Sequence, residues 1–504
     1  MEYESALRRP RHVGPHGDFS SVFSDFSADQ MYPFQHRFAM LGLVTGAVAS
    51  IYWGSLLAGF AFLVLFLCIG VTWRRNEPPI LAFCLSYQWF FVMAGYLYGS
   101  KTGGYLEALG LQSVEILDRA IGLSLVGFLV IAAGIRVAWG LIASPPVRTF
   151  EGRFEESRSY DIRRLFWLVA AIFLFNWFVD VGPGFLIPSA GQIVEKVLDF
   201  REVLLVMLLA IVLHRNDGYK YALGAFAVAI VPELASTQMD FKTLFFYVIV
   251  LLATEWRPGT TFRFLQIRNR RIVSATVLIC TFILVSGVVW EGAIKPVWRW
   301  AGAEGNPITR VQTFLELSSE AVENFQVREG VDALVSRVES TGQFALVLRR
   351  VPQDLRHERG ALLRRTVEHV TMPRVIFPDK PILNATELAT KYAGLTIKQG
   401  TSVGIGYMAE FYVDFGEYGM FVPMFFYGLL IGGIYTLLAR STRTFELFSA
   451  GAIVIYIDHF TSYEGEFAKL VGGIIMSTII FLLIVRFVEP SIQRMIQPHR
   501  DAEA

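Results

Sequence analysis

The sequence predicts an all-α, polytopic membrane protein. Of its 504 residues, 54% are hydrophobic, 42 are Phe and only 18% are charged, whereas soluble domains carry roughly 25% charge. The apolar residues fall in runs of about 17–25, the length that crosses a bilayer. We count about 12 spans on this criterion, with one large external loop between the ninth and the tenth. The three cysteines, Cys68, Cys84 and Cys280, lie inside apolar runs, which excludes a disulfide framework and a CxxC metal motif.

The first part of the chain is predicted to be a tail followed by a membrane bundle. Residues 1–37 are polar and lack the short basic-then-apolar layout of a signal peptide, so we expect a cytoplasmic tail. Residues 38–290 are expected to form a bundle of about nine spans. Its first apolar block, Phe38–Trp73, is too long for one helix and predicts two, joined near Trp53-Gly54. The later spans of this bundle are predicted at about 79–99, 119–143, 163–181, 201–214, 220–236, 242–256 and 272–290.

A long polar insert, residues 291–418, separates this bundle from a second one. The second bundle, residues 419–487, is expected to hold about three spans, near 419–439, 446–459 and 467–487. Residues 488–504 are polar and are predicted to form a C-terminal cytoplasmic tail. The insert contains most of the candidate functional residues.

Orientation follows from the short loops, because Lys and Arg accumulate on the cytoplasmic side. With both termini in the cytoplasm, the basic clusters alternate with poorly charged loops through every turn. The cytoplasmic residues are then Arg8, Arg9, Arg11, Arg37, Arg74, Arg75, the cluster from Arg148 to Arg164, Arg215, Lys220, the run Arg257–Arg271, Arg440, Arg443, Arg494 and Arg500. The insert is therefore predicted to be external, which in a bacterium means periplasmic.

The later part of the insert is basic. Residues 337–398 hold eleven Lys and Arg against six acidic residues. Fixed cations on the outer side of a membrane suit an anionic partner such as phosphate or pyrophosphate. Two other readings remain open: each charge can be ordinary solvated surface, and the whole insert can be a lid without chemistry.

Glu410 and Asp414 precede the tenth span and are four residues apart, so they share one face if the segment is helical. A carboxylate at the membrane edge can act as a general base when burial tunes its pKa. The alternative is that Glu410 forms a structural pair with a nearby arginine.

Several cations are candidates for stabilising a leaving group. Pro373-Arg374 and Pro378-Asp379-Lys380-Pro381 are rigid turns that present Arg374 and Lys380. Arg201 and Lys242 lie at the external ends of short spans, where snorkelling is the alternative explanation. Arg337 is the first residue of the basic part of the insert.

The glycine run Gly400–Gly406 matches neither the Walker pattern nor a GxGxxG fingerprint, which argues against nucleotide binding. Gly404 and Gly406 are expected to let the backbone re-enter the membrane surface or approach a ligand closely. His459 belongs to a polar cluster at the outer end of the eleventh span, a functional candidate by default. His, Asp and Glu are nowhere at metal-ligand spacing, so we expect no metal and no cofactor. We expect no nucleic-acid partner.

The segment from Arg337 onward resembles the bacterial oligosaccharide repeat unit polymerases, the Wzy-type O-antigen and exopolysaccharide polymerases. The similarity lies in the long external loop before the last three spans and in the two proline-flanked cations at 373–381. It continues through Ser402-x-Gly404-x-Gly406 and Ala409-Glu410-x-Tyr412-x-Asp414-Phe415-Gly416-x-x-Gly419. About 80 residues carry it closely, and the topology carries it along the whole chain.

This resemblance implies a GT-C-like glycosyltransferase in the inner membrane, with its active site in the periplasm. Its substrate would be an oligosaccharide on undecaprenyl pyrophosphate, which is polymerised into O-antigen, capsule or exopolysaccharide without a metal. Glu410 would be the base, with Arg374 and Lys380 at the leaving group. Membrane lipids, a chain-length regulator and a flippase would be its partners. The substrate-binding residues would be Arg337, Arg201, Lys242, Tyr412, Asp414, Gly404, Gly406 and His459.

Two alternatives remain. An O-antigen ligase, which moves polymer onto lipid A core, resembles the polymerases in topology but relies on a histidine of the large loop, where this chain has His357 and His369. A transporter of polysaccharide or lipid is the non-catalytic alternative. Transporters show broken helices and midplane charges, often in paired halves, whereas the ionisable groups here gather outside the spans.

Overall fold

All regular elements of the described chain are helical, which confirms the predicted all-α class. The structure is a computed structural model. It describes residues 33–73, 79–103, 113–142, 157–181, 200–235, 242–254, 267–297, 316, 321, 323–372, 377, 384–397, 403–441, 451–452 and 459–497.

The first two helices form the predicted hairpin. Helix α2 covers Pro33–Trp53 and α3 covers Leu56–Thr72. The turn between them contains Gly54 at φ +65°, a left-handed conformation that glycine adopts without steric cost. Ser55 then caps α3, because its hydroxyl accepts a hydrogen bond from the Ala58 N–H at 3.3 Å. A turn residue and a cap residue therefore end one apolar helix and start the next.

The remaining helices of the first bundle follow the predicted ranges closely. They are α4 (Ile80–Thr102), α6 (Val114–Leu141), α8 (Ile162–Val181), α10 (Phe200–Arg215), α11 (Tyr219–Ala235), α12 (Lys242–Thr254) and α13 (Ile267–Val289), which continues into the π-helical turn η3 (Trp290–Ile294). The 28-residue α6 begins five residues earlier than expected, because Ser113 accepts a hydrogen bond from the Glu115 N–H and starts the helix there.

The insert and the second bundle are also helical. Their elements are α16 (Val327–Val338), α17 (Thr341–Arg350), α18 (Ala361–Thr371), α19 (Ala385–Leu388), η4 (Ala389–Ala393), α20 (Tyr407–Gly419), α21 (Phe421–Ser441), α24 (Phe467–Phe487) and α25 (Glu489–Ile496). Helices α21 and α24 match the predicted tenth and last spans. Most of the predicted eleventh span, near 446–459, lies outside the described residues.

Five of the described helices are long and apolar enough to cross a membrane: Ile80–Thr102, Val114–Leu141, Ser274–Val297, Phe421–Ser441 and Phe467–Phe487. The apolar window of the third is only 6% buried, against 39–61% for the other four. Such exposure suits a helix surrounded by lipid, where apolar side chains need no protein cover. These helices support a helical membrane protein, and the count of about 12 spans stays a prediction.

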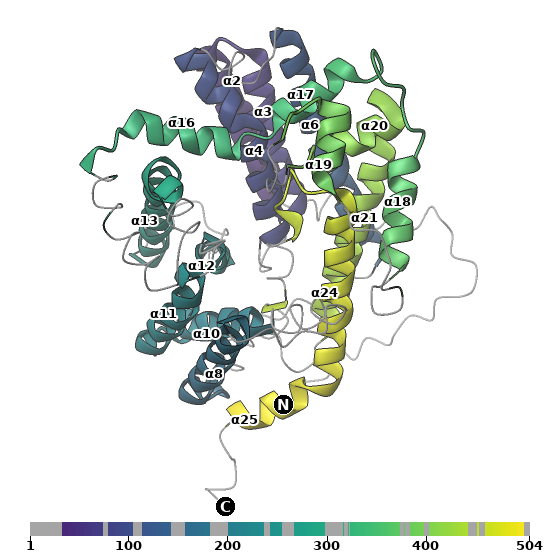
Figure 1. The fold of residues 1–504 in the computed structure, drawn as a ribbon. Helices are drawn as coiled ribbons and strands as arrows, with labels where there is room; N and C mark the ends of the chain where they lie inside the picture. Colours follow the sequence, from purple (N-terminus) through teal and green to yellow (C-terminus); the bar gives the residue numbers. More distant parts are fainter. Residues whose placement is uncertain are drawn as a thin grey trace, which may run out of the picture.

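The helices lie in two groups, which α16 connects. Figure 1 shows α8, α10, α11, α12 and α13 on one side of the molecule and α4, α6, α20, α21 and α24 on the other. Helix α16 lies at the upper left of the view and contacts both α13 and α4.

Helices α6 and α21 pack most closely along a line of glycines. A side chain at Gly428 would place its Cβ 2.2 Å from the Ile131 carbonyl oxygen, and one at Gly432 would be 2.8 Å from that of Ile135. Gly428 and Gly432 form a G-x-x-x-G motif, which lets two membrane helices approach at their backbones. Because α21 starts two residues after α20 ends, this contact also fixes the position of α20.

Candidate functional site

Helix α20 is the centre of the candidate site. Its residues from Tyr407 to Asp414 are all buried. Glu410 and Asp414 lie one turn apart, as the sequence predicts. Each carboxylate accepts hydrogen bonds from the first turn of a different helix, so α20 joins the insert to the second bundle.

Glu410 lies at the start of α24. Its side chain is buried, and its Oε1 accepts a hydrogen bond from the N–H of Phe467, the first residue of that helix, at 3.0 Å. Burial raises the pKa of Glu410 to about 8, because a carboxylate loses its hydration there. The Phe467 hydrogen bond lowers this pKa, Glu466 and Asp414 raise it, and Arg365 lowers it.

No described arginine forms an ion pair with Glu410. The structural alternative to a catalytic role is therefore helix capping, in which the side chain satisfies one of the free N–H groups of α24. No described residue donates a hydrogen bond to the second carboxylate oxygen, Oε2. One oxygen is thus held in place while the other keeps its acceptor capacity.

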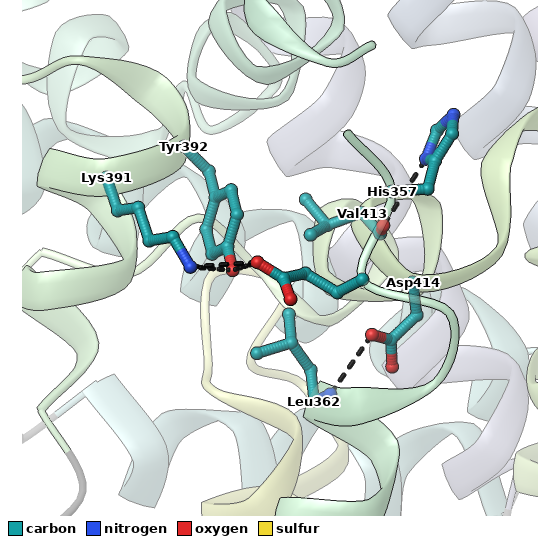
Figure 2. Close-up of polar contacts among 7 residues, drawn as sticks. His357, Leu362, Lys391, Tyr392, Val413 and Asp414 are labelled. Carbon is teal, nitrogen blue, oxygen red and sulfur yellow. Dashed lines mark hydrogen bonds and ion pairs between the residues drawn. The ribbon is translucent and has the colours of Figure 1, made fainter. Parts of the chain in front are cut away.

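Asp414 lies at the start of α18. Its two oxygens accept hydrogen bonds from the N–H groups of Leu362 at 3.0 Å and Leu363 at 2.7 Å, and Figure 2 shows the first of these. Burial raises the pKa of Asp414, and the hydrogen bonds from this first turn oppose the shift. Asp414 is therefore engaged as a cap, which explains its place in the sequence without a role in chemistry.

Replacing Asp414 with Ala is expected to destabilise α18 by about 1–2 kcal/mol, the usual cost of a lost cap. Amide hydrogen exchange across residues 361–371 measures this directly, and exchange there should become faster. The matched control is Glu368→Ala, which removes an exposed ion pair to Arg364 on the same helix, worth about 0–1 kcal/mol. Equal protection in the two variants would contradict the capping assignment.

His357 also contacts the C-terminal part of α20. Its Nδ1 lies 3.1 Å from the Tyr412 carbonyl oxygen and 3.3 Å from that of Val413, and Figure 2 shows the ring beside this helix. Carbonyl oxygens only accept, so Nδ1 carries the hydrogen. In the neutral ring Nε2 is then an acceptor, and it lies beside Gly416.

A closed polar cluster next to His357 consists of Glu358, Lys391 and Tyr392. The Glu358 Oε1 accepts hydrogen bonds from Lys391 Nζ at 2.8 Å and from the Tyr392 hydroxyl at 2.6 Å. Figure 2 shows Lys391 and Tyr392 pointing at one carboxylate. These bonds lower the pKa of Glu358, while burial raises that of Tyr392 to about 12. All three groups keep their ordinary charge near neutral pH, so this cluster fixes η4 and is not a proton-transfer site.

The glycine segment before α20 approaches its own chain closely. A Cβ on Gly404 would be 2.4 Å from the Glu464 carbonyl oxygen, and one on Gly406 would be 2.8 Å from that of Tyr463. Gly406 also has φ +83°, where side chains are strained. The close contact of these glycines among the described residues is with the backbone of 463–464, and the predicted approach to a ligand stays a prediction.

The backbone of 463–464 belongs to the segment 459–466, which polar side chains of α4, α6 and α20 hold in place. Gln88 of α4 is fully buried and donates to the Phe460 carbonyl, while its own Oε1 accepts from Tyr407 at 2.7 Å. Ser124 of α6 bonds the Tyr463 hydroxyl at 2.8 Å.

Two of the predicted binding residues belong to this part of the molecule. Arg337 of α16 pairs with Glu464 at 2.9 Å, and its side chain is 52% exposed. His459 lies 3.3 Å from the Ser477 hydroxyl of α24.

The predicted site residues therefore fall into three sets. Gly404, Gly406, Glu410, Tyr412, Asp414, Arg337 and His459 come together around α20 and the 459–466 segment. Arg201 lies on α10, over the Phe173 ring at 5.3 Å, and Figure 1 shows α10 well away from α20. Arg374, Lys380 and the side chain of Lys242 lie outside the described residues, and Lys242 is the first residue of α12.

Tyr412 has a packing position in this arrangement. Its hydroxyl donates to the Val351 carbonyl at 3.0 Å, and its ring packs against Phe344 and His357. It connects α20 to α17 and is 2% exposed, which places it beneath the site surface.

Two residues around α20 were not singled out from the sequence. Gln88 carried a usable signal, since a polar residue inside a predicted span is a functional candidate. Arg365 carried none, because it is one arginine among eleven basic residues of the insert. Across the described part of the chain, no group of three or more His, Cys, Asp or Glu side chains is placed to hold a metal ion.

Comparison with known proteins adds a family to this description. No curated protein and no solved structure matches the chain. Residues 89–495, which include α20 and most of the described helices, match the model of one family. The chain therefore belongs to the family described as a domain of unknown function, DUF8712.

Proposed function

We propose that this protein is a membrane glycosyltransferase that polymerises oligosaccharide units carried on undecaprenyl pyrophosphate, on the periplasmic face of a bacterial inner membrane. In this reaction a hydroxyl of the acceptor sugar attacks the anomeric carbon of the donor. The new C–O bond forms as the bond to undecaprenyl pyrophosphate breaks, and the hydroxyl proton goes to a base. No metal and no nucleotide sugar enter the reaction.

Glu410 is the observation on which this proposal rests. It is a buried carboxylate whose pKa is about 8, which is near the range in which a general base works best. Its Oε1 is fixed by the Phe467 N–H, so the side chain is held in one orientation. Its Oε2 carries no hydrogen bond from a described residue and is the atom assigned to accept the proton.

The raised pKa of Glu410 predicts that the stability of the protein depends on pH. The folded-state pKa is about 8 and the ordinary value is 4.5. Between these pH values the folded chain binds one more proton than the unfolded chain, so stability falls as pH rises. The stability is highest below pH 4.5. It then decreases by on the order of 1 kcal/mol per pH unit and levels off above the folded-state pKa. Thermal midpoints of the wild type and Glu410→Gln in detergent measure this. The variant should lack that decline, and parallel curves would contradict the assignment.

The direct test is reconstitution of the full-length protein in liposomes with an undecaprenyl-pyrophosphate-linked repeat unit. A ladder of products that differ by one repeat, formed without an added energy source, supports the proposal. Recovery of only the unreacted repeat unit, on either leaflet, overturns it. Unreacted repeat unit that has moved across the bilayer is the result that a transporter gives.

His357 favours a ligase as the second candidate. Its Nδ1–H is held by the Tyr412 and Val413 carbonyls, which leaves Nε2 as the acceptor, the arrangement of an oriented base. A ligase would transfer finished polymer from undecaprenyl pyrophosphate to lipid A core. Glycan length in cells separates the two. Loss of a polymerase leaves single repeats attached to the core, whereas loss of a ligase leaves polymer on the carrier lipid.

A further inference from the structure

Two adjacent arginines of α18 have different surroundings. Arg364 is 77% exposed at its side chain and lies 3.6 Å from Glu368 in an ion pair. Arg365 is partly buried, and no described residue gives it a hydrogen bond or an ion pair. A guanidinium has five N–H donors, and removing a charged donor from water without a partner costs free energy. The N–H donors of Arg365 are therefore not used by any described residue, and an anion would satisfy them.

Arg365 lies near the candidate base. Arg365 follows Leu363 by two residues, and the Leu363 N–H binds Asp414, which lies one turn from Glu410 on α20. Its positive charge lowers the pKa of Glu410. The two groups nevertheless form no ion pair with each other in the described part of the chain. The positive charge is thus close to the carboxylate without being neutralised by it.

Helix α18 lies along the end of a candidate span. It packs against α24 and α20, as Figure 1 shows, and a Cβ at Gly472 of α24 would lie 3.7 Å from Val370. Val367 of α18 and Met372, which directly follows the helix, are 55% and 42% exposed. An amphipathic helix with exposed apolar residues beside a span is typical of the membrane interface. If α24 crosses the bilayer and begins at its outer side, as the sequence predicts, Arg365 lies at the level of the lipid phosphates.

We propose that Arg365 binds the phosphate group of a membrane lipid, next to Glu410, and that this lipid is the polyprenyl pyrophosphate donor. This inference rests on the proposed function for the identity of the lipid. A guanidinium binds phosphate oxygens through two parallel N–H bonds, a geometry that lysine lacks. Arg365 would bring the leaving group to the site, while Glu410 receives the proton at the acceptor.

The test measures lipid binding by the purified full-length protein in nanodiscs of phosphatidylcholine. The probe is undecaprenyl pyrophosphate, and undecaprenol, which has the same chain without phosphates, is the matched probe. Arg365→Ala is expected to weaken binding of the pyrophosphate by roughly 10- to 100-fold, the scale of one charge-assisted contact. Arg365→Lys should recover part of the affinity, and Arg364→Ala should stay within about twofold. Undecaprenol should not distinguish the wild type from Arg365→Ala.

Equal weakening by Arg364→Ala and Arg365→Ala would overturn the proposal, because it would indicate general surface charge. Amide hydrogen exchange of α18 in Arg365→Lys, unchanged from the wild type, controls for misfolding. Displacement of the pyrophosphate from the wild type by phosphatidylglycerol would assign the phosphate to bulk lipid, and would overturn its identification as the donor.

The Arg365 inference and the proposed polymerase function can each fail without the other. If the wild type transfers no sugar but binds undecaprenyl pyrophosphate through Arg365, the phosphate site stands and the polymerase proposal fails. If the wild type makes polymer and Arg365→Ala binds the pyrophosphate as well as the wild type does, the Arg365 inference alone fails.

Discussion

Glu410→Gln is expected to reduce polymer formation by at least about 100-fold, the lower end of what a general base contributes. Glutamine keeps the size of the side chain and an oxygen that accepts the Phe467 N–H bond, so the start of α24 should remain intact. It cannot take a proton from an attacking hydroxyl. The chain-length distribution of glycan from cells or from the liposome assay measures the effect.

The control for this variant is Glu417→Gln on the same helix. Glu417 pairs with Arg119, and its side chain is 33% exposed, so its loss should leave the glycan profile unchanged. The pH profile gives a second readout. Because the base acts when deprotonated and its pKa is about 8, the wild-type rate should rise with pH up to that value and then level off. A normal glycan profile in Glu410→Gln would remove Glu410 from the mechanism and leave it a helix cap.

The helices were predictable because their signals are local. The turn at Gly54, the cap at Ser55 and the unbroken apolar run of Phe467–Phe487 each lie within a few residues of the boundary they set. A bilayer also requires long helices with internally satisfied backbones. For this reason α24 begins and ends at the predicted residues.

The role of the two carboxylates was not predictable in the same way. The i, i+4 spacing correctly placed Glu410 and Asp414 on one face, but their partners are 57 and about 52 residues away in the chain. Spacing within α20 carries no information about which helices begin beside it. Arg201 shows the same limit, because its charge at a span end indicated an external position but not the neighbouring helices.

Gly404→Ala is expected to be the most damaging single change to the folded site. The new Cβ would lie 2.4 Å from the Glu464 carbonyl oxygen, a backbone atom that cannot rotate away. The 459–466 segment would have to move, with loss of the Arg337–Glu464 pair and of the Tyr463 contact to Ser124. Overpacking of this kind costs about 1–3 kcal/mol or more. The thermal midpoint and the yield of protein extracted in detergent measure it.

Gly122→Ala in α6 is the matched control, because nothing lies within 4 Å of its added Cβ and alanine favours a helix by roughly 1 kcal/mol over glycine. That variant should be as stable as the wild type or more so. Equal behaviour of the two variants would show that the 403–406 segment does not need its close contact with 463–464. The comparison with Glu410→Gln is then informative, because that change should remove activity from a folded protein. Gly404→Ala should instead remove the folded support on which Glu410 and the start of α24 depend.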